Sequence, residues 1–311
     1  MVKKATREAF GEALLALGKA HPEIVVLDAD LSKSTKTDLF AKEIPERFFE
    51  MGIQEMNMIG VAAGLALSGK VPFICSFACF ITGRFDQIKM AISYSRAPVC
   101  VVGSHAGIGV GEDGYSQQGL EDIALMRALP EMTVLQPADD LETRGAMEEL
   151  VAHPRPAYLR TTRQKLERVN PDGYRFELGK GVVLRPGRDL TIVASGGTVG
   201  PALEAARALG GAGVDARVVN IHTIKPLDAD LLAACARETG RVVTVEDHQI
   251  TGGLGGAVCE ALAERCPVPV KRHGVLDVFG ESGSPDELYA RHGLDAAGIT
   301  RVVQAFVAAK A

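Results

Sequence analysis

Apolar residues recur along the chain in two patterns, short unbroken runs and longer stretches with a helical period. The runs at 24–27, 71–75 and 98–103 are apolar almost throughout, which is typical of parallel strands buried on both faces. Residues 6–20 carry apolar side chains three and four positions apart, which predicts an amphipathic helix. Residues 54–67 are apolar nearly all round, so we expect a buried helix there. Strands that alternate with helices indicate an α/β fold with mostly parallel sheets.

The alternation restarts after one polar stretch, residues 164–178, which contains the turn signal Asn170-Pro-Asp-Gly and is the expected linker. Before the linker, the pattern predicts further elements at 80–94, 119–128, 133–135, 140–151 and 157–159. After it, the pattern predicts strands at 190–194, 216–219, 241–245 and 268–271, and helices at 199–209, 227–238, 256–265, 286–292 and 295–309. The chain is therefore expected to form two doubly wound domains with flanking helices, 1–165 and 178–311.

The composition excludes some classes of partner and indicates the cellular compartment. With Lys+Arg 34 against Asp+Glu 39, the net charge of −5 offers no basic excess for nucleic acid. The six cysteines form no C-x-x-C pair, which disfavours zinc and disulfides and fits a reducing compartment. The N-terminus lacks the apolar core of a signal peptide, and the apolar stretch 71–83 falls short of the roughly 20 residues that cross a bilayer. We therefore expect a cytoplasmic protein with neither a nucleic-acid nor a membrane partner.

Glu55 is the first unusual residue, because it opens a predicted helix that carries no other charge until Lys70. A first-turn acid commonly complements the helix dipole, and spacing alone favours that role. Apolar surroundings, however, favour the protonated form of a carboxyl group, which suits proton exchange with a ring nitrogen. Both interpretations stay open at this point.

Phe77 and Phe80 lie three residues apart in Ser76-Phe-Ala-Cys-Phe80. Aromatic residues at this spacing usually pack in a core. They also provide a flat surface on which a heteroaromatic ring can stack.

A glycine-rich loop, Ser104-His-Ala-Gly-Ile-Gly-Val-Gly-Glu-Asp-Gly114, follows the strand predicted at 98–103. Its G-x-G-x-x-G pattern does not open a helix at the third glycine, which argues against a dinucleotide site. The glycines instead indicate backbone in unusual conformations beside a ligand. His105 and Asp113 lie on this loop, beyond the carboxyl end of a strand, where α/β proteins bind ligands. Arg160 and Arg163 follow another strand end and are either solvated charges or a clamp for a carboxylate or phosphate.

Four segments together resemble the transketolase family: Gly52-Ile-Gln-Glu-Met-Asn-Met, Ser76-Phe-Ala-Cys-Phe, Gly107-Ile-Gly-Val-Gly-Glu-Asp-Gly114 and Arg127-Ala-Leu-Pro-Glu-Met-Thr133. They occur in the family's order and spacing, and the resemblance covers nearly the whole chain. It implies the pyrimidine-binding domain followed by the C-terminal domain of a thiamine-diphosphate enzyme. The expected activity is transfer of a two-carbon ketol unit between sugar phosphates, as in the pentose phosphate pathway.

The chain has no G-D-G motif, through which the family's first domain holds thiamine diphosphate and its metal ion. The resemblance therefore implies the C-terminal subunit of a split transketolase. Its Mg²⁺ and diphosphate are expected on a separate N-terminal subunit, with no metal ligand on this chain. Two copies of each chain are expected to assemble as α₂β₂, and the chain alone should be inactive.

On the cofactor side, the resemblance gives roles to four residues. Glu55 corresponds to the glutamate that exchanges a proton with N1′ of the aminopyrimidine and is expected to be catalytic. Phe80, with Phe77 nearby, corresponds to the wall on which the pyrimidine stacks. Asp30 corresponds to a position close to both cofactor and substrate.

On the substrate side, His105 corresponds to a histidine that contacts the donor's hydroxyl groups and is the second expected catalytic residue. Asp113 corresponds to an aspartate that contacts sugar hydroxyls. Arg163 corresponds to the arginine that grips the sugar phosphate, together with Ser34.

Three positions depart from the family pattern. Gln117 stands where transketolases usually have a histidine that contacts the donor, and an amide can hydrogen-bond there but cannot carry a proton. Lys3 stands in the expected place of the N-terminal phosphate-binding arginine, as a point charge without a fork. Gly83 replaces an aromatic residue near the cofactor. These departures affect the expected sugar preference more than the cofactor.

Other thiamine-diphosphate proteins share this architecture and remain alternatives. The β subunit of 2-oxo-acid dehydrogenase E1 is a separate chain of similar length, but its loop usually reads A-x-H-S where this chain has Gly109-Val-Gly-Glu-Asp-Gly. Deoxyxylulose-phosphate synthase matches Asp86-Gln87 better, but normally carries all three domains in one chain. A regulatory partner subunit without activity would not need the candidate site residues together.

Overall fold

The computed structural model describes residues 3–309 and arranges most of its strands in two sheets. The strand order of the first sheet is β12 (Thr223–Lys225), β6 (Thr133–Leu135), β7 (Ala157–Arg160), β5 (Cys100–Ser104), β4 (Val71–Phe77), β2 (Ile24–Asp28) and β3 (Phe48–Glu50). All neighbours in this sheet are parallel except β12, which runs antiparallel to β6. The first sheet therefore takes one edge strand from the distant second half of the chain.

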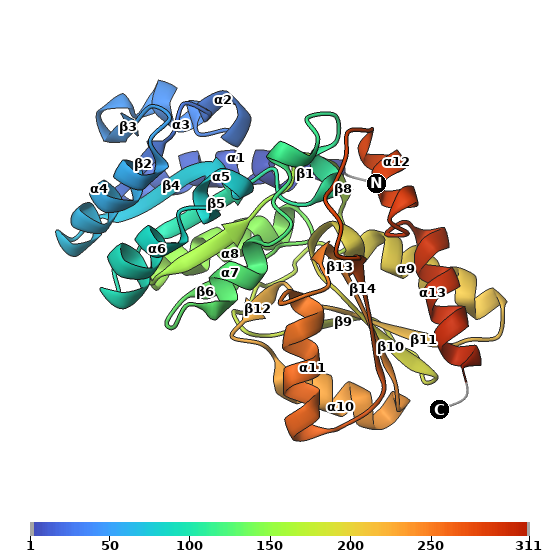
Figure 1. Cartoon of the computed structure of the whole chain (residues 1–311). Helices are drawn as coiled ribbons and strands as arrows, with labels where there is room; N and C mark the ends of the chain where they lie inside the picture. Colours follow the sequence, from blue (N-terminus) through green and yellow to red (C-terminus); the bar gives the residue numbers. More distant parts are fainter. Residues whose placement is uncertain (1–2, 310–311) are drawn as a thin grey trace.

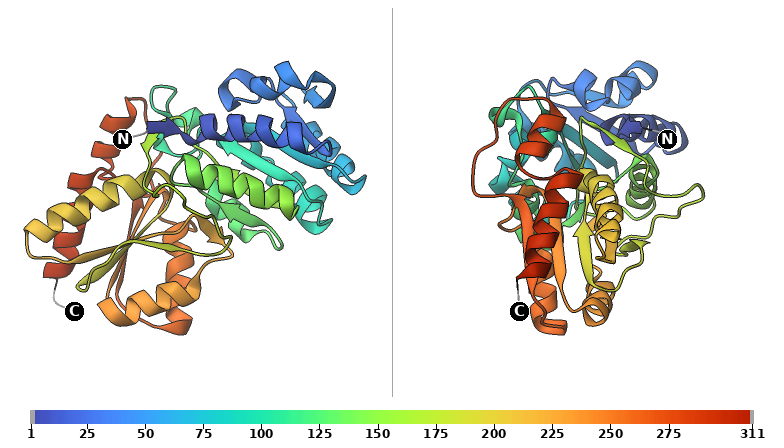
Figure 2. Two further views of the ribbon diagram at one scale, coloured as in Figure 1. Left: turned by 180° about the vertical axis from the view of Figure 1, so that it is seen from behind. Right: turned by 90° about the vertical axis from the view of Figure 1, so that its right-hand side faces the viewer.

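Helices cover both faces of the first sheet (Figures 1 and 2). One face carries α1 (Thr6–Ala20) and α8 (Asp140–Ala152), which lie side by side. The other carries α4 (Glu55–Leu67), α5 (Ala78–Thr82), α6 (Phe85–Ile88) and α7 (Asp122–Ala128). The short helices α2 (Ser32–Thr35) and α3 (Asp38–Glu43) follow β2.

The second sheet has the order β14 (Val270–Val275), β13 (Val242–Gln249), β10 (Leu190–Ala194), β11 (Ala216–Asn220) and β9 (Val182–Arg185). Only β9 is antiparallel to its neighbour here. Its helices are α9 (Val199–Gly211), α10 (Ala229–Thr239), α11 (Leu254–Arg265), α12 (Pro285–Arg291) and α13 (Ala296–Ala308). The predicted fold class, α/β with mostly parallel sheets and flanking helices, is thus confirmed.

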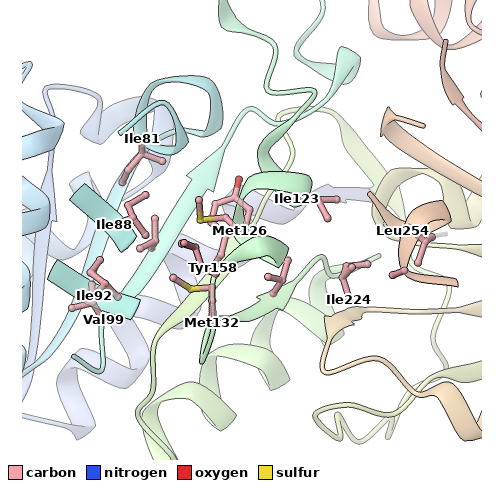
Figure 3. Close-up of a cluster of buried hydrophobic side chains, with 14 of the residues drawn as sticks. Ile81, Ile88, Ile92, Val99, Ile123, Met126, Met132, Tyr158, Ile224 and Leu254 are labelled. Atoms are coloured by element: carbon pink, nitrogen blue, oxygen red, sulfur yellow. The ribbon is translucent and has the colours of Figure 1, made fainter. Parts of the chain in front are cut away.

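One apolar core runs through both halves of the chain. Figure 3 shows it extending from Ile81 and Ile88 on one side, through Met126 on α7, to Ile224 and Leu254 of the second half. Because residues from both sheets share this core, the two halves are packed as one body around it. The domain boundaries predicted from the sequence, 1–165 and 178–311, stay a prediction.

Two sequence predictions are wrong in detail. The helix expected over 80–94 is broken into α5, α6 and a turn of π-helix, Lys89–Tyr94, because Gly83 ends α5 and weakens helical continuity. The start of the expected linker is occupied by β8 (Lys165–Glu167), which pairs antiparallel with β1 (Lys3–Ala5). Neither of these three-residue strands is long enough to show a hydrophobic period, so the sequence pattern did not predict them.

The helix α4 is not buried all round, contrary to expectation. Met56, Val61 and Leu67 on it are exposed, and so are the nearby Ile53 and Tyr94. An apolar face of this kind on a single chain commonly marks a contact with another protein. Within the described residues, no helix combines the length and apolarity needed to cross a membrane.

Candidate functional site

The site lies at the carboxyl ends of β2, β4, β5 and β7, four parallel strands that neighbour one another in the first sheet. In register, Asp28 is opposite Cys75, Phe77 is opposite Ser104, and Gly103 is opposite Arg160. The loops that leave these strands carry most of the predicted site residues. Open α/β sheets bind ligands at this edge.

Glu55 is the first residue of α4, and the residue is only 4% exposed. The buried Ser76 hydroxyl, on β4, donates a hydrogen bond of 3.0 Å to Glu55 Oε1. The N-terminus of a helix favours a negative charge, so the position of Glu55 is consistent with a role in complementing the helix dipole. The burial and the hydroxyl partner also give this carboxyl a fixed orientation, as proton exchange with a bound ring would require.

Phe77 stacks against two other rings. Its centroid lies 5.6 Å from that of Phe80, with planes 6° apart, and 3.8 Å from that of His105, with planes 19° apart. Phe77 is buried, whereas Phe80 on α5 is half-buried. Phe80 is therefore the ring that still has surface for a further aromatic group, and Phe77 supports it.

His105 is held in a strained and buried position. Its φ of 54° is in the left-handed region, which is uncommon for a residue with a Cβ. Its Nε2 is 2.8 Å from Arg7 Nη1, and its Nδ1 is 2.8 Å from Ser104 Oγ. Because a guanidinium can only donate, Nε2 accepts, and the ring proton belongs on Nδ1.

Burial, followed by the charges of Arg7, Arg163 and Lys36, lowers the pKa of His105 to about 3. The imidazole is therefore neutral near pH 7. A neutral ring whose Nε2 already accepts a hydrogen bond is better suited to holding a polar group than to moving a proton. The predicted catalytic and substrate-binding roles of His105 both stay predictions.

Two arginines lie near this histidine. Arg7 Nη1 donates to the Ser34 backbone oxygen at 3.0 Å, and burial, followed by Arg163, lowers the pKa of Arg7. Arg163 Nη1 donates to the Val110 oxygen at 2.9 Å and to Asp113 Oδ1 at 3.1 Å. Both guanidiniums thus converge on the glycine-rich loop, and together they can bind an anionic group.

Arg7 is the site residue that the sequence analysis missed. It belongs to the polar stripe of an amphipathic helix, where a charged side chain normally faces solvent. Lys3, which we assigned to anion binding, instead pairs with Glu167 at 2.9 Å and is largely exposed. None of its described contacts is with His105 or Arg163, so the structure does not bring Lys3 to the site.

The remaining predicted residues, Asp30, Ser34 and Gln117, are exposed or half-buried and make no described side-chain contact with Glu55, Phe80 or Arg163. Asp30 is exposed, has a φ of 61°, and donates its backbone N–H to Glu50 Oε1 at 2.7 Å. Ser34 is half-buried on α2 and contributes its backbone oxygen. Gln117 is half-buried, and its Nε2 donates to Ser116 Oγ at 3.2 Å.

Arg160 is a structural residue, not part of a clamp. It is fully buried, and its Nε and Nη2 donate to the Asp122 carboxylate at 2.7 and 3.1 Å. Nη2 also donates to the oxygens of Gly119 and Asp247, each at 3.0 Å. Arg160 therefore joins the two halves of the chain behind the site.

Residues 3–309 contain no cluster of three or more His, Cys, Asp or Glu side chains that could hold a metal ion. The candidate site thus consists of a buried carboxyl, an aromatic face and a positively charged edge formed by Arg7 and Arg163.

Fold and site together define an α/β protein that carries a buried carboxyl, an aromatic face and two guanidiniums at the carboxyl edge of a parallel sheet. The family model of the transketolase pyrimidine-binding domain matches residues 2–168, and that of the transketolase C-terminal domain matches residues 179–299. The chain belongs to the transketolase family and corresponds to its C-terminal section. Members of this family are transferases that generally use thiamine diphosphate with a divalent cation.

Relatives of similar length support this placement. A putative transketolase C-terminal section from Methanocaldococcus jannaschii is 46% identical over 304 residues, covering 96% of this chain and 95% of that protein. A subunit of a 6-deoxy-6-sulfo-D-fructose transketolase from a Clostridium species is 42% identical, covering 95% and 92%. Rat transketolase is 41% identical over 98% of this chain, which spans 49% of the rat protein.

A solved structure described as a split gene transketolase, an inactive β4 tetramer, has a TM-score of 0.91 and 49% identity, covering 99% of both chains. The chain is therefore similar along its whole length to subunits of split transketolases.

Proposed function

We propose that this chain supplies the pyrimidine-binding side of a transketolase that transfers a two-carbon ketol unit from a ketose phosphate to an aldose phosphate. The observation that carries the proposal is the placement of three different groups along one sheet edge. These are the buried carboxyl of Glu55, the half-buried ring of Phe80, and the guanidiniums of Arg7 and Arg163. Pentose phosphate metabolism in the cytoplasm is the proposed setting.

The residues at the edge fit an aminopyrimidine ring. Phe80 offers a ring face, backed by Phe77, and the Glu55 carboxyl is oriented by Ser76 in a setting from which water is largely excluded. Glu55 would hold a proton at its carboxyl oxygen for a ring nitrogen, and Asp30 would lie at the rim. Thiamine diphosphate, when bound, supplies an electron sink for the negative charge left as a carbon–carbon bond beside a carbonyl breaks.

The positive edge fits the anionic end of a sugar phosphate. Arg7 and Arg163 would pair with the anion, and the neutral His105, whose Nε2 accepts from Arg7, would hold that guanidinium in place. Asp113, Gln117 and Ser34 would contact the sugar. The names of two relatives, a 6-deoxy-6-sulfo-D-fructose transketolase and an apulose-4-phosphate transketolase, include both a sulfonate and a phosphate.

We further propose an N-terminal partner chain that holds the diphosphate and Mg²⁺. The described residues offer no metal cluster, and the exposed apolar side chains on and beside α4 begin next to Glu55. Figure 1 places α4 on the outside of the molecule, away from the second sheet. A partner covering this face would bury both its apolar surface and the ring site, and two copies of each chain would give α₂β₂.

Reconstitution tests the proposal. The chain alone, supplied with thiamine diphosphate and Mg²⁺, should show no ketol transfer. The chain mixed with an N-terminal transketolase subunit should show it, and light scattering should report α₂β₂. Activity of the chain alone, or an active αβ heterodimer, would contradict this account. Fructose 6-phosphate and its 6-deoxy-6-sulfo analogue, compared as donors, would identify the preferred anion.

The variant Glu55→Gln tests the proposed proton exchange by Glu55. The variant keeps the shape of the side chain and can still accept from Ser76, but it cannot exchange the proton. We expect it to assemble and to exchange the cofactor's C2 proton about 10²–10⁴-fold more slowly. A role limited to the helix dipole would cost roughly 0.3–1 kcal/mol of stability and leave exchange unchanged. NMR of C2–H exchange on the bound cofactor separates the two outcomes before any sugar is added.

A further inference from the structure

Asp247, on the second sheet, reaches across to the glycine-rich loop of the first half. It lies near the end of β13 and is almost fully buried. Its Oδ1 accepts the backbone N–H of Ile108 at 2.8 Å, and its Oδ2 accepts that of Gly109 at 3.4 Å. The two partners are 139 and 138 residues away in the sequence. A carboxylate from one half of the chain thus holds the loop backbone of the other.

The Asp247 carboxylate is itself fixed by neighbouring groups. Tyr289 Oη donates to its Oδ2 at 3.0 Å, and Gln164 Nε2 donates to the same hydroxyl at 2.7 Å. The Asp247 backbone oxygen accepts from Arg160 Nη2. A residue held at both its side chain and its backbone is a rigid support for the backbone N–H groups that its carboxylate binds.

The loop approaches Asp247 so closely that a side chain has no room. Gly107 has a φ of 81°, and a Cβ placed on it would lie 2.1 Å from Asp247 Oδ2. Both the conformation and the contact require glycine there. The close approach of the Asp247 carboxylate to the loop therefore depends on glycine at position 107.

Ile108 and Gly109 immediately precede the loop residues that bind the Arg163 guanidinium. Val110, one residue beyond Gly109, accepts from Arg163 Nη1 at 2.9 Å, and Asp113 on the same loop accepts from the same nitrogen. Displacement of Ile108 and Gly109 would move both acceptors and release the guanidinium.

We propose that Asp247 is a positioning residue, which fixes the loop of residues 107–113 so that Val110 and Asp113 orient Arg163 for the anionic end of the substrate. The expected effect of Asp247 on substrate affinity rests on the proposed function, whereas its expected effect on the loop backbone does not. A merely structural role would be to dock the two halves of the chain, with no specific effect on the loop or on anion affinity.

Hydrogen exchange of the full chain, read by mass spectrometry, tests the loop directly. Asp247→Ala leaves two backbone N–H groups without their acceptor, and exchange of residues 107–113 should rise by at least roughly tenfold. Asp247→Asn keeps one acceptor oxygen and should give a smaller rise. Tyr289→Phe removes one support of the carboxylate and should act in the same direction.

The matched control is Asp295→Ala. The Asp295 carboxylate also accepts a backbone N–H, that of Gly298 at 2.8 Å, but it does so at the start of α13. This variant should leave the loop unchanged. Wild-type exchange of the loop in all three test variants, or equal acceleration by Asp295→Ala, would overturn the proposal. If Asp247→Ala does not fold, Asp247→Asn and Tyr289→Phe decide.

Kinetics of the assembly reconstituted with an N-terminal transketolase subunit test the substrate part. Asp247→Asn should raise the KM of fructose 6-phosphate by about tenfold, change that of hydroxypyruvate little, and leave the cofactor's C2–H exchange at the wild-type rate. Equal rises in both KM values would indicate a general structural role and overturn the positioning role. An inactive wild-type assembly would count against the proposed function instead, and the hydrogen-exchange result would still decide whether Asp247 holds the loop.

Discussion

Replacing Arg160 by methionine should destabilise the protein far more than removing an exposed charge. The side chain is fully buried, and it pairs with Asp122 through two hydrogen bonds of 2.7 and 3.1 Å. It also satisfies two backbone oxygens, those of Gly119 and Asp247. Arg160→Met would leave a carboxylate and two carbonyl groups buried without this partner.

The expected loss is about 3–5 kcal/mol, the typical effect of breaking a buried ion pair by removing one partner. A domain's total free energy of unfolding is about 5–15 kcal/mol, so the variant should be marginal. Tyr158 Oη still donates to Asp122 at 2.6 Å, which limits the loss. Changing both partners, Arg160→Met with Asp122→Leu, should recover most of it, because no charge is then left unpaired.

The effect should also depend on pH. Burial raises the pKa of Asp122, but the charge and hydrogen bonds of Arg160 outweigh burial and lower it below the ordinary 3.8. The pair therefore stabilises the wild type above that pH, and this contribution is lost as the pH falls through the lowered pKa. Without Arg160 the carboxyl can protonate, so the destabilisation should be smaller at pH 5 than at pH 7.

Urea unfolding followed by far-UV circular dichroism measures these differences. The control is Arg96→Met, which breaks a 3.1 Å pair with Glu131 whose side chains are 74% and 51% exposed. Such a pair contributes about 0–1 kcal/mol. If Arg160→Met cost no more than Arg96→Met, or if the double variant were no better than the single, the reasoning from burial would be refuted.

Further outcomes concern the positive edge of the site. In the reconstituted assembly, Arg163→Ala and Arg7→Ala should each raise the KM of a ketose phosphate by about 10- to 100-fold and that of hydroxypyruvate little; equal effects would indicate structural roles. Lys3→Ala should change neither KM, because Lys3 pairs with Glu167, and a selective rise would restore it to the site. The folded chain holds His105 neutral, since burial and then Arg7 lower its pKa from 6.5 to about 3. Stability should therefore fall as the pH drops below 6.5, and His105→Asn should reduce that slope by up to about 1.4 kcal/mol per pH unit in urea unfolding at pH 7, 6 and 5.

Much of the fold could be predicted because its elements have strong periods. The helix at 6–20 and the strands at 133–135 and 190–194 agree with α1, β6 and β10 residue for residue. The strand β12 could not be predicted, because three residues, Thr-Ile-Lys, carry no period, and its partner lies some 90 residues earlier in the chain. Local patterns do not encode which distant strand closes a sheet edge.

The candidate site was predictable where residue type was unusual for its setting, and not elsewhere. Glu55 stood out as a lone acid in an apolar helix, and His105 as a histidine among glycines. Arg7 did not stand out, because a charged residue on the polar stripe of a helix has a sufficient explanation in solvent. Asp247 lies within the buried strand β13, near its end, and only the folded chain shows that its partners are Ile108 and Gly109.

The antiparallel edge strand β12 makes the two halves mechanically interdependent. The first half expressed alone, ending within 164–178, would lack this strand, and its β6 edge would be left with unpaired N–H and C=O groups. The apolar side chains of Ile123 and Met126 would at the same time lose Ile224 and Leu254 as neighbours. Proteolysis in the linker should therefore give two fragments that stay associated until denatured. Either half expressed separately should tend to aggregate through its unpaired sheet edge. A chimera that takes its C-terminal half from a relative should therefore keep the β12 segment from the same protein as the first sheet.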